Sequence, residues 1–188
     1  MAREKSKLIL VLGGARAGKS SFALRLAARS SDDPACFIAT APALDEEMAI
    51  RIARHREERP KHWQTIEEPY QLDRALLQVA EAPVVIVDCL TLFVSNWLLR
   101  SENENQCERL VQEISERFLK TVTSQPKKVI CVSNEVGLGI VSETPLGRTF
   151  RDLLGRVNQQ FAEAADEVYL LIAGLPLRLK PSDLLCNE

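Results

Sequence analysis

Residues 8–20 read Leu-Ile-Leu-Val-Leu-Gly-Gly-Ala-Arg-Ala-Gly-Lys-Ser, and the expected fold is built outward from them. Five apolar residues lead directly into Gly13-x-x-x-x-Gly18-Lys19-Ser20, the G-x-x-x-x-G-K-[ST] pattern of a phosphate-binding loop. The apolar run predicts a buried parallel strand, and the composition after Ser20 predicts a helix. Glycines between them let backbone N–H groups converge on an anion, which the positive end of the helix also attracts.

This loop predicts a nucleotide site that includes a magnesium ion. Lys19 is expected to reach the β- and γ-phosphates, and Ser20 to hold Mg²⁺ through its hydroxyl. A glycine-rich turn with a lone lysine is the alternative, and the strand–loop–helix context disfavours it. We assign nucleotide contacts to the whole loop: Gly13, Gly14, Ala15, Arg16, Ala17, Gly18, Lys19 and Ser20.

Five short apolar segments are spaced along the chain, at residues 8–12, 36–39, 84–87, 129–132 and 168–172. Most do not alternate with polar residues, which is typical of parallel strands covered on both faces. Segments of helical character separate them, at 45–59, 69–80, 89–99, 110–122 and 145–165. This order predicts an α/β P-loop NTPase with right-handed crossovers.

The length of 188 residues favours a single domain over 1–188. Residues 101–106 are expected to form a loop, and about 181–188 a flexible tail.

Composition narrows the class of protein. The formal net charge of −2 gives no electrostatic footprint for nucleic acid. No apolar run reaches the roughly 18 residues of a membrane span, and the charged start does not resemble a signal peptide. The five cysteines are scattered without a C-x-x-C pair, which favours reduced thiols in a cytoplasmic protein and disfavours structural zinc.

The charged helix expected at 45–59 contains His55 among several arginines. Neighbouring glutamates explain most of these charges as a solvated helix face. Positive neighbours disfavour protonation, so the imidazole of His55 would stay neutral and nucleophilic near pH 7, beside charges that attract polyphosphate. From these residues alone, a surface histidine and a functional one both stay open.

Polar residues follow three of the predicted strands, where the carboxyl edge of an open α/β sheet carries its ligand site. Thr40 is a candidate ligand contact, although its position alone favours an ordinary strand-end threonine. Asp88 follows four apolar residues and is expected on the Mg²⁺ side of the nucleotide, with a capping aspartate as the alternative. Residues 133–139 predict another site loop or a flexible turn.

Several separate stretches match one family, at residues 13–20, 39–41, 45–48, 51–55, 59–63, 88–91, 133–141, 155–159 and 164–168. The most specific are Arg-Ile-x-x-His-x-x-x-Arg-Pro at 51–60 and Asn-Glu-Val-Gly-x-Gly at 134–139. On these stretches the chain resembles the bifunctional adenosylcobinamide kinase / adenosylcobinamide-phosphate guanylyltransferase family of cobalamin biosynthesis. One departure is Ala17, where many members carry serine.

The resemblance implies two reactions. ATP or GTP phosphorylates the aminopropanol arm of adenosylcobinamide, and GTP then donates GMP to that phosphate, which gives adenosylcobinamide-GDP and pyrophosphate. The guanylylated histidine of the family corresponds to His55, whereas His62 has no counterpart. The remaining nucleotide contacts that it implies are Ala39, Thr40, Ala41, Arg56, Glu57, Glu58, Arg59, Glu67 and Asp88. It also implies a RecA-like, mostly parallel sheet and a homotrimer.

Two rival functions remain at this stage. One is a P-loop kinase that acts on another small alcohol, with His55 on the surface. The other is a non-catalytic nucleotide switch. If the two-reaction hypothesis holds, kinase chemistry needs the γ-phosphate and guanylylation needs the α-phosphate, so we expect the segment around His55 to move between the half-reactions.

Overall fold

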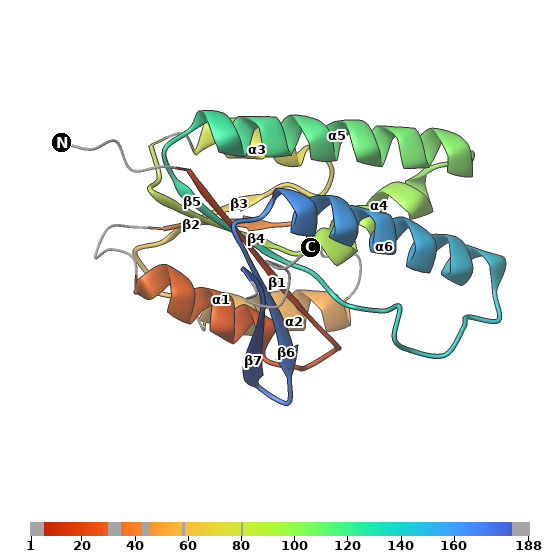
Figure 1. Cartoon of the computed structure of the whole chain (residues 1–188), viewed down its shortest axis with the longest axis horizontal. Helices are drawn as coiled ribbons and strands as arrows, with labels where there is room; N and C mark the ends of the chain where they lie inside the picture. Colours follow the sequence, from red (N-terminus) through yellow and green to blue (C-terminus); the bar gives the residue numbers. More distant parts are fainter. Residues whose placement is uncertain (1–5, 30–34, 43–45, 58, 80, 182–188) are drawn as a thin grey trace, which may run out of the picture.

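The computed structural model describes residues 6–29, 35–42, 46–57, 59–79 and 81–181. Strands and helices alternate through most of the chain (Figure 1). The strands are β1 (Lys7–Gly13), β2 (Cys36–Ala39), β3 (Gln64–Glu67), β4 (Val84–Asp88), β5 (Lys128–Val132), β6 (Glu167–Ile172) and β7 (Leu175–Lys180). The helices are α1 (Lys19–Ala28), α2 (Glu46–Glu57), α3 (Leu72–Gln78), α4 (Leu90–Arg100), α5 (Glu104–Ser124) and α6 (Pro145–Ala164).

The strands form one sheet in the order β3-β2-β4-β5-β1-β6-β7, in which only β7 pairs antiparallel. Helices α3, α4, α5 and α6 cover one face, and α1 and α2 lie on the other (Figure 1). This arrangement confirms the predicted α/β fold with a mostly parallel sheet. Because the parallel strands end together, the residues that follow β1, β2, β4 and β5 meet at one edge.

Both faces of the sheet are packed against apolar side chains. Alternate residues of β1 belong to different clusters: Leu10 packs on the side of α4, α5 and α6, and Val11 on the side of α1. Burial on both faces explains why the predicted strands read as continuous apolar runs. The described cysteines are free thiols, and Cys36, Cys107 and Cys131 are buried.

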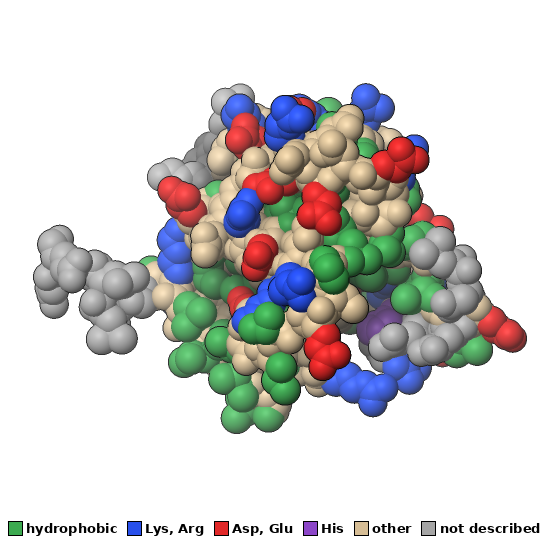
Figure 2. Space-filling view, turned by 90° about the vertical axis from the view of Figure 1, so that its right-hand side faces the viewer, with side chains coloured by type: hydrophobic (Ala, Val, Ile, Leu, Met, Phe, Trp, Pro, Cys, Tyr) green, Lys and Arg blue, Asp and Glu red, His purple; other side chains and the backbone are tan. Residues whose placement is uncertain are grey.

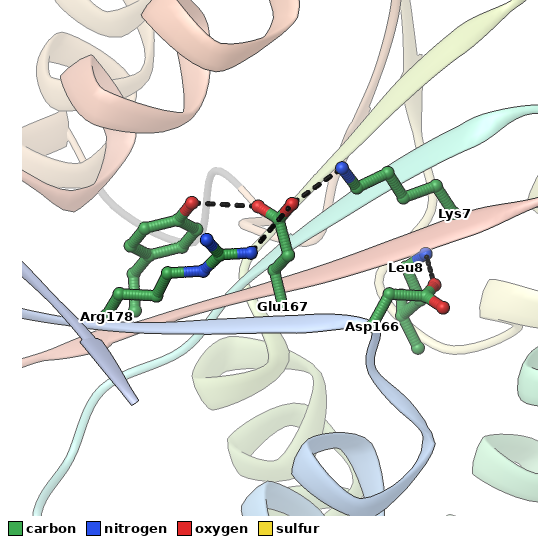
Figure 3. Close-up of polar contacts among 6 residues, drawn as sticks. Lys7, Leu8, Asp166, Glu167 and Arg178 are labelled. Atoms are coloured by element: carbon green, nitrogen blue, oxygen red, sulfur yellow. Dashed lines mark hydrogen bonds and ion pairs between the residues drawn. The ribbon is translucent and has the colours of Figure 1, made fainter. Parts of the chain in front are cut away.

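Glu167 ties β1, β6 and β7 together (Figure 3). Its carboxylate accepts a hydrogen bond from Tyr169 Oη at 2.8 Å and forms ion pairs with Lys7 at 2.6 Å and Arg178 at 3.4 Å. The neighbouring Asp166 Oδ2 accepts the backbone N–H of Leu8 at 2.7 Å. These contacts hold the β6–β7 hairpin beside the strand that carries the phosphate loop.

Two strands were not predicted. β3 consists of four residues, of which two are exposed, so no buried apolar run marks it in the sequence. No strand was predicted after residues 168–172, but Leu175–Lys180 pairs with β6. Its side chains are almost all exposed, and only pairing with β6 makes it a strand. The predicted tail lies outside the described residues apart from Pro181.

The predicted helices are present, with some corrected bounds. Residues 101–106 were expected to be a loop, but α5 begins at Glu104, where Asn103 Oδ1 accepts the N–H of Gln106. α3 is shorter than predicted, and α2 ends at Glu57, so Arg59 follows it. Of the helices in the described part of the chain, none combines the length and the apolar character that crossing a membrane requires.

Candidate active site

The phosphate loop joins β1 to α1 through backbone conformations that favour glycine. Gly18 has a φ of 88°, and Gly13 a φ of 152°. A Cβ at Gly13 would lie 2.6 Å from the carbonyl oxygen of Leu171 on β6, so the glycine also permits a close approach of two strands. The N–H of Gly174, in the β6–β7 turn, donates to the carbonyl of Ala17 at 3.1 Å. The hairpin therefore supports the loop from one side.

Lys19 is held inside the loop. Its side chain is 8% exposed, and Nζ donates a hydrogen bond to the carbonyl of Gly14 at 2.6 Å. Burial lowers the pKa of Lys19, and the negative charge of Asp88 opposes that shift. A bound phosphate would supply a second anion next to this ammonium group.

Asp88 ends β4 opposite the loop. Burial raises the pKa of its carboxyl, and a hydrogen bond with Ser20 and nearby positive charges oppose the rise. Mg²⁺ in nucleotide sites is commonly held by one or two carboxylates, phosphate oxygens and water. A hydroxyl and a carboxylate that already face each other fit this ion, so Ser20 and Asp88 are the residues that would hold it.

A cavity of about 490 Å³ opens over the loop. Its walls come from the loop, the ends of β2, β4 and β5, and one side of α2. The predicted residues that line it are Ala15, Arg16, Ala17, Gly18, Lys19, Ser20, Ala39, Ala41, His55, Arg59 and Asp88. Residues far apart in the sequence thus form one site, and basic side chains and a histidine gather near a hollow of the surface in Figure 2.

His55 reaches this cavity from the last turn of α2. Its side chain is partly buried, and it lines the cavity together with Asp88. Arg59 follows the helix and is held in place: its guanidinium stacks on the ring of Phe37 at 3.4 Å and donates to Thr65 Oγ1 at 3.2 Å. The cavity therefore offers a histidine and a fixed positive charge to the ligand that occupies the phosphate loop.

Several predicted contacts do not line the cavity. The side chain of Thr40 is fully buried, and its hydroxyl bonds both the N–H and the carbonyl of Cys89, at 2.7 and 2.8 Å. Thr40 thereby positions the chain just after Asp88. Arg56 and Glu67 form an ion pair with each other at the surface, and Glu57 is exposed. Glu58 lies outside the described residues.

The structure adds residues that were not assigned from the sequence. Thr91 and Asn134 line the cavity, and Thr91 Oγ1 accepts the N–H of Asn134 at 2.7 Å. Asn158 on α6 donates to the carbonyl of Asn134 at 3.0 Å. Asn134 belongs to the loop predicted after β5, but only the packing of α4 and α6 shows which of its residues faces the nucleotide site.

Comparison with known proteins identifies relatives across nearly the whole chain. The family model "Cobinamide kinase / cobinamide phosphate guanyltransferase" matches residues 9–179. The bifunctional adenosylcobalamin biosynthesis protein CobU of Escherichia coli (strain K12) is 41% identical over 182 residues, which cover 92% of this chain and 99% of that protein. The bifunctional protein CobP of Pseudomonas aeruginosa is 46% identical over 172 residues, with 91% and 96% covered.

Solved structures with much lower sequence identity share the fold. A KaiC-like protein from Pyrococcus horikoshii has a TM-score of 0.50 at 15% identity, with 88% of this chain and 71% of that chain covered. The flagellar accessory protein FlaH from Methanocaldococcus jannaschii has a TM-score of 0.51 at 16% identity, with 94% and 79% covered. These similarities confirm a RecA-like P-loop architecture.

Proposed function

Because the chain belongs to the cobinamide kinase / cobinamide phosphate guanyltransferase family, we propose that one cavity carries both activities. In this proposal the phosphate loop binds the nucleoside triphosphate, and His55 accepts GMP from GTP. The observation that carries it is the place of His55, which reaches the same cavity as Lys19 and Asp88 from a separate helix.

In the kinase reaction, the hydroxyl of the aminopropanol arm of adenosylcobinamide attacks the γ-phosphorus of ATP or GTP. The bond between that phosphorus and the β–γ bridging oxygen breaks, and the nucleoside diphosphate leaves. Lys19 and the loop N–H groups hold the phosphates, and their positive charge stabilises the charge that develops during transfer. Mg²⁺ held by Ser20 and Asp88 would neutralise phosphate charge.

In the guanylyl transfer, a ring nitrogen of neutral His55 attacks the α-phosphorus of GTP. The bond to the bridging oxygen of the β-phosphate breaks, and pyrophosphate leaves. An oxygen of the cobinamide phosphate then attacks the same phosphorus, breaks the P–N bond and returns a neutral imidazole. Arg59 is the positioned cation for the phosphates, and Ala39 and Ala41 lie where β2 ends at the cavity.

The remaining family contacts are proposed for the guanylyl half-reaction. Three of them, Arg56, Glu57 and Glu58, directly follow His55 in the sequence. The fourth, Glu67 on β3, forms an ion pair with Arg56 that joins β3 to α2. Because this pair is exposed, a guanine base or ribose can exchange hydrogen bonds with it at little cost. Thr40 contributes by holding the end of β2 in place, since its hydroxyl, its N–H and its carbonyl already bond Cys89, Asp88 and Asn96.

Labelled GTP tests the proposal directly. Incubation of the full chain with GTP labelled at the α-phosphate should label the protein, and GTP labelled at the γ-phosphate should not. A phosphoramidate bond predicts a label that is lost in acid and stable in alkali. If no α-label is retained, the transferase half of the proposal is wrong, and a kinase of other specificity or a nucleotide switch remains.

We also propose that the chain assembles as a homotrimer through exposed apolar side chains. Ile172, Leu175 and Leu177 are 61%, 73% and 54% exposed on the β6–β7 hairpin, and β7 is an edge strand. Hydrophobic side chains gather at the lower edge of the molecule in Figure 2, where Figure 1 shows this hairpin. Such a patch on an open edge is typical of an interface.

Sedimentation analysis of wild type and Leu175→Glu tests this assembly. The wild type should sediment as a trimer and the variant as smaller species, whereas a monomeric wild type would contradict the proposal.

The free cysteines further favour a reducing compartment, so we place the enzyme in the cytoplasm.

A further inference from the structure

A second cavity, of about 480 Å³, lies beside α6 on the other face of the sheet. It is lined by Leu12 at the end of β1, by Glu135 and Gly137 in the loop after β5, and by one side of α6. Leu12 packs in the apolar cluster of α4, α5 and α6, which places this cavity away from α1 and α2. None of its lining residues lines the nucleotide cavity, although Asn158 bonds the carbonyl of Asn134, which does.

Two polar atoms among the residues that line this cavity have no hydrogen-bond partner among the described residues. One is Oδ1 of Asn158, whose side chain is only 4% exposed. The other is Nη1 of Arg151, whose Nη2 donates to the carbonyl of Gly137 at 2.6 Å. An unsatisfied buried acceptor and donor cost free energy, and both belong to residues that line the cavity, so a ligand that entered it and bonded them would recover that cost.

Gly155 gives a second, independent indication that this cavity holds a ligand. It lies in the interior of α6, where glycine is less favourable than alanine by about 1 kcal/mol. A Cβ at Gly155 would meet no atom within 4 Å, so packing does not require glycine there. Because Gly155 lines the cavity, the absence of a side chain there leaves the cavity open.

The two cavities border the same loop after β5. Asn134 lines the nucleotide cavity, and the next residue, Glu135, lines the second cavity. The backbone N–H of Glu135 donates to the carbonyl of Gly13 at 3.1 Å, and Asn158 donates to the carbonyl of Asn134. A ligand in the second cavity therefore lies next to the chain segments that flank the phosphate loop.

The lining is largely apolar, and its charged side chains are nearly balanced. Arg151 and Arg156 are opposed by Glu135 and Asp152, and Arg156 is already paired with Glu108 on α5. Such a wall favours a neutral group that both donates and accepts hydrogen bonds over an anion. A primary carboxamide has this chemistry: its N–H can bond Asn158 Oδ1, and its carbonyl can bond Arg151 Nη1.

We propose that this cavity is the acceptor subsite and that it holds the carboxamide-bearing rim of the corrin ring. This inference rests on the proposed function, since cobinamide carries such carboxamides around its ring. The volume suits one edge of the ring, from which the aminopropanol arm extends past Glu135 toward the nucleotide.

A pair of substitutions at Gly155 tests the subsite. Gly155→Trp should fill the cavity and raise the KM for cobinamide about tenfold or more, a change equivalent to about 1.4 kcal/mol of binding free energy. Gly155→Ala leaves the cavity open and should keep that KM within about twofold of wild type. Both variants should take up the α-label from GTP as wild type does, because that step needs no acceptor.

A second pair of substitutions tests the subsite if thermal unfolding shows that Gly155→Trp does not fold. Arg151→Gln removes the unpartnered donor and should raise the KM for cobinamide severalfold. Arg148→Gln is the matched control on α6, because Arg148 bonds the carbonyls of Ser142 and Glu143 outside the cavity.

The readouts separate failure of the subsite from failure of the proposed function. If folded Gly155→Trp and Arg151→Gln both keep the KM for cobinamide of wild type, the subsite is wrong while the two activities stand. A rise in the KM for GTP with no change for cobinamide would also overturn it. If wild type itself takes up no α-label, the guanylyl-transfer proposal fails, and the kinase KM for cobinamide still reports on the subsite.

Discussion

The phosphate loop and helix α2 face each other across one cavity, but the fold holds them very differently. The loop follows a strand that is buried from Leu8 to Gly13, and Lys19, Phe22 and Ala23 of the next helix are buried as well. α2 has no buried side chain among those that the structure describes, and Ile50 is 64% exposed. Met48 and Ile52 are only partly buried, so few apolar contacts hold α2 in place.

This difference matches the demands of two reactions on one nucleotide. The phosphates need donors that are already in place, because preorganised charge contributes most to phosphoryl transfer. His55 must approach the α-phosphorus for one reaction and leave the γ-phosphorus accessible for the other. We therefore infer that the loop stays fixed while α2 shifts between the half-reactions, which its few buried contacts make inexpensive.

The largest expected effect separates the two activities. His55→Ala should reduce guanylyl transfer about a thousandfold or more, because the covalent route is lost, and should leave the kinase reaction within about threefold of wild type. Assays of cobinamide phosphate formation and of its guanylylation measure the two rates. His62→Ala is the matched control, since His62 is exposed and lies outside the cavity wall. Equal loss of both activities in His55→Ala would contradict the covalent role and would mean that His55 serves nucleotide binding in both reactions.

Replacing Asp88 should weaken catalysis and strengthen the fold. Asp88→Asn removes a carboxylate from the proposed magnesium site, and we expect both activities to fall about a hundredfold. Burial raises the pKa of Asp88 in the folded chain, so ionisation of this group destabilises the fold as pH rises. The variant should unfold at a higher temperature than wild type at pH 7.

The pH dependence of the difference in unfolding temperature between Asp88→Asn and wild type provides the control. This difference should disappear as pH falls below the unfolded-state pKa of aspartate, about 3.9, where both proteins carry a neutral side chain at position 88. A variant that is less stable than wild type at pH 7 would show that the opposing charges outweigh burial.

Two neighbouring glycines test how firmly the loop is held. Gly13→Ala places a Cβ 2.6 Å from the carbonyl oxygen of Leu171 and should lower the free energy of unfolding by about 2–4 kcal/mol. Gly14→Ala meets no atom within 4 Å and should change it by less than about 0.5 kcal/mol. Denaturant unfolding of both variants gives the comparison, and equal values for the two would mean that the loop adapts more easily than its packing indicates.

The smallest effect concerns α2 itself. Amide hydrogen exchange should be faster in α2 than in β1 and α1 in the ligand-free protein, because local opening there exposes little buried surface. Trapping the guanylylated state with GTP should slow exchange in α2 and leave β1 unchanged. Protection of α2 equal to that of β1 without ligand would contradict the inferred movement.

The success and failure of the sequence predictions follow one rule. Strands β1, β2, β4 and β5 are marked by apolar runs because most of their side chains are buried, and β6 by an apolar run that is partly buried. β3 and β7 lie at the two edges of the sheet and have no buried side chain, so their sequences carry no such signal. Thr40 shows the same limit at the site: its place at a strand end was predictable, but the bond of its hydroxyl to Cys89 was not.

By itself, the sequence determined the α/β class, the phosphate loop and the family. A buried parallel strand, a glycine-rich turn and a helix start each impose local constraints on composition, and these constraints are visible in a single chain. Tertiary structure decided which residues surround the ligand. His55, Asp88 and Asn134 meet because separate crossovers bring the strand ends and α2 to one edge, and Asn158 and Gly155 face the second cavity through the packing of α6. Such contacts depend on non-local geometry, which no local spacing encodes.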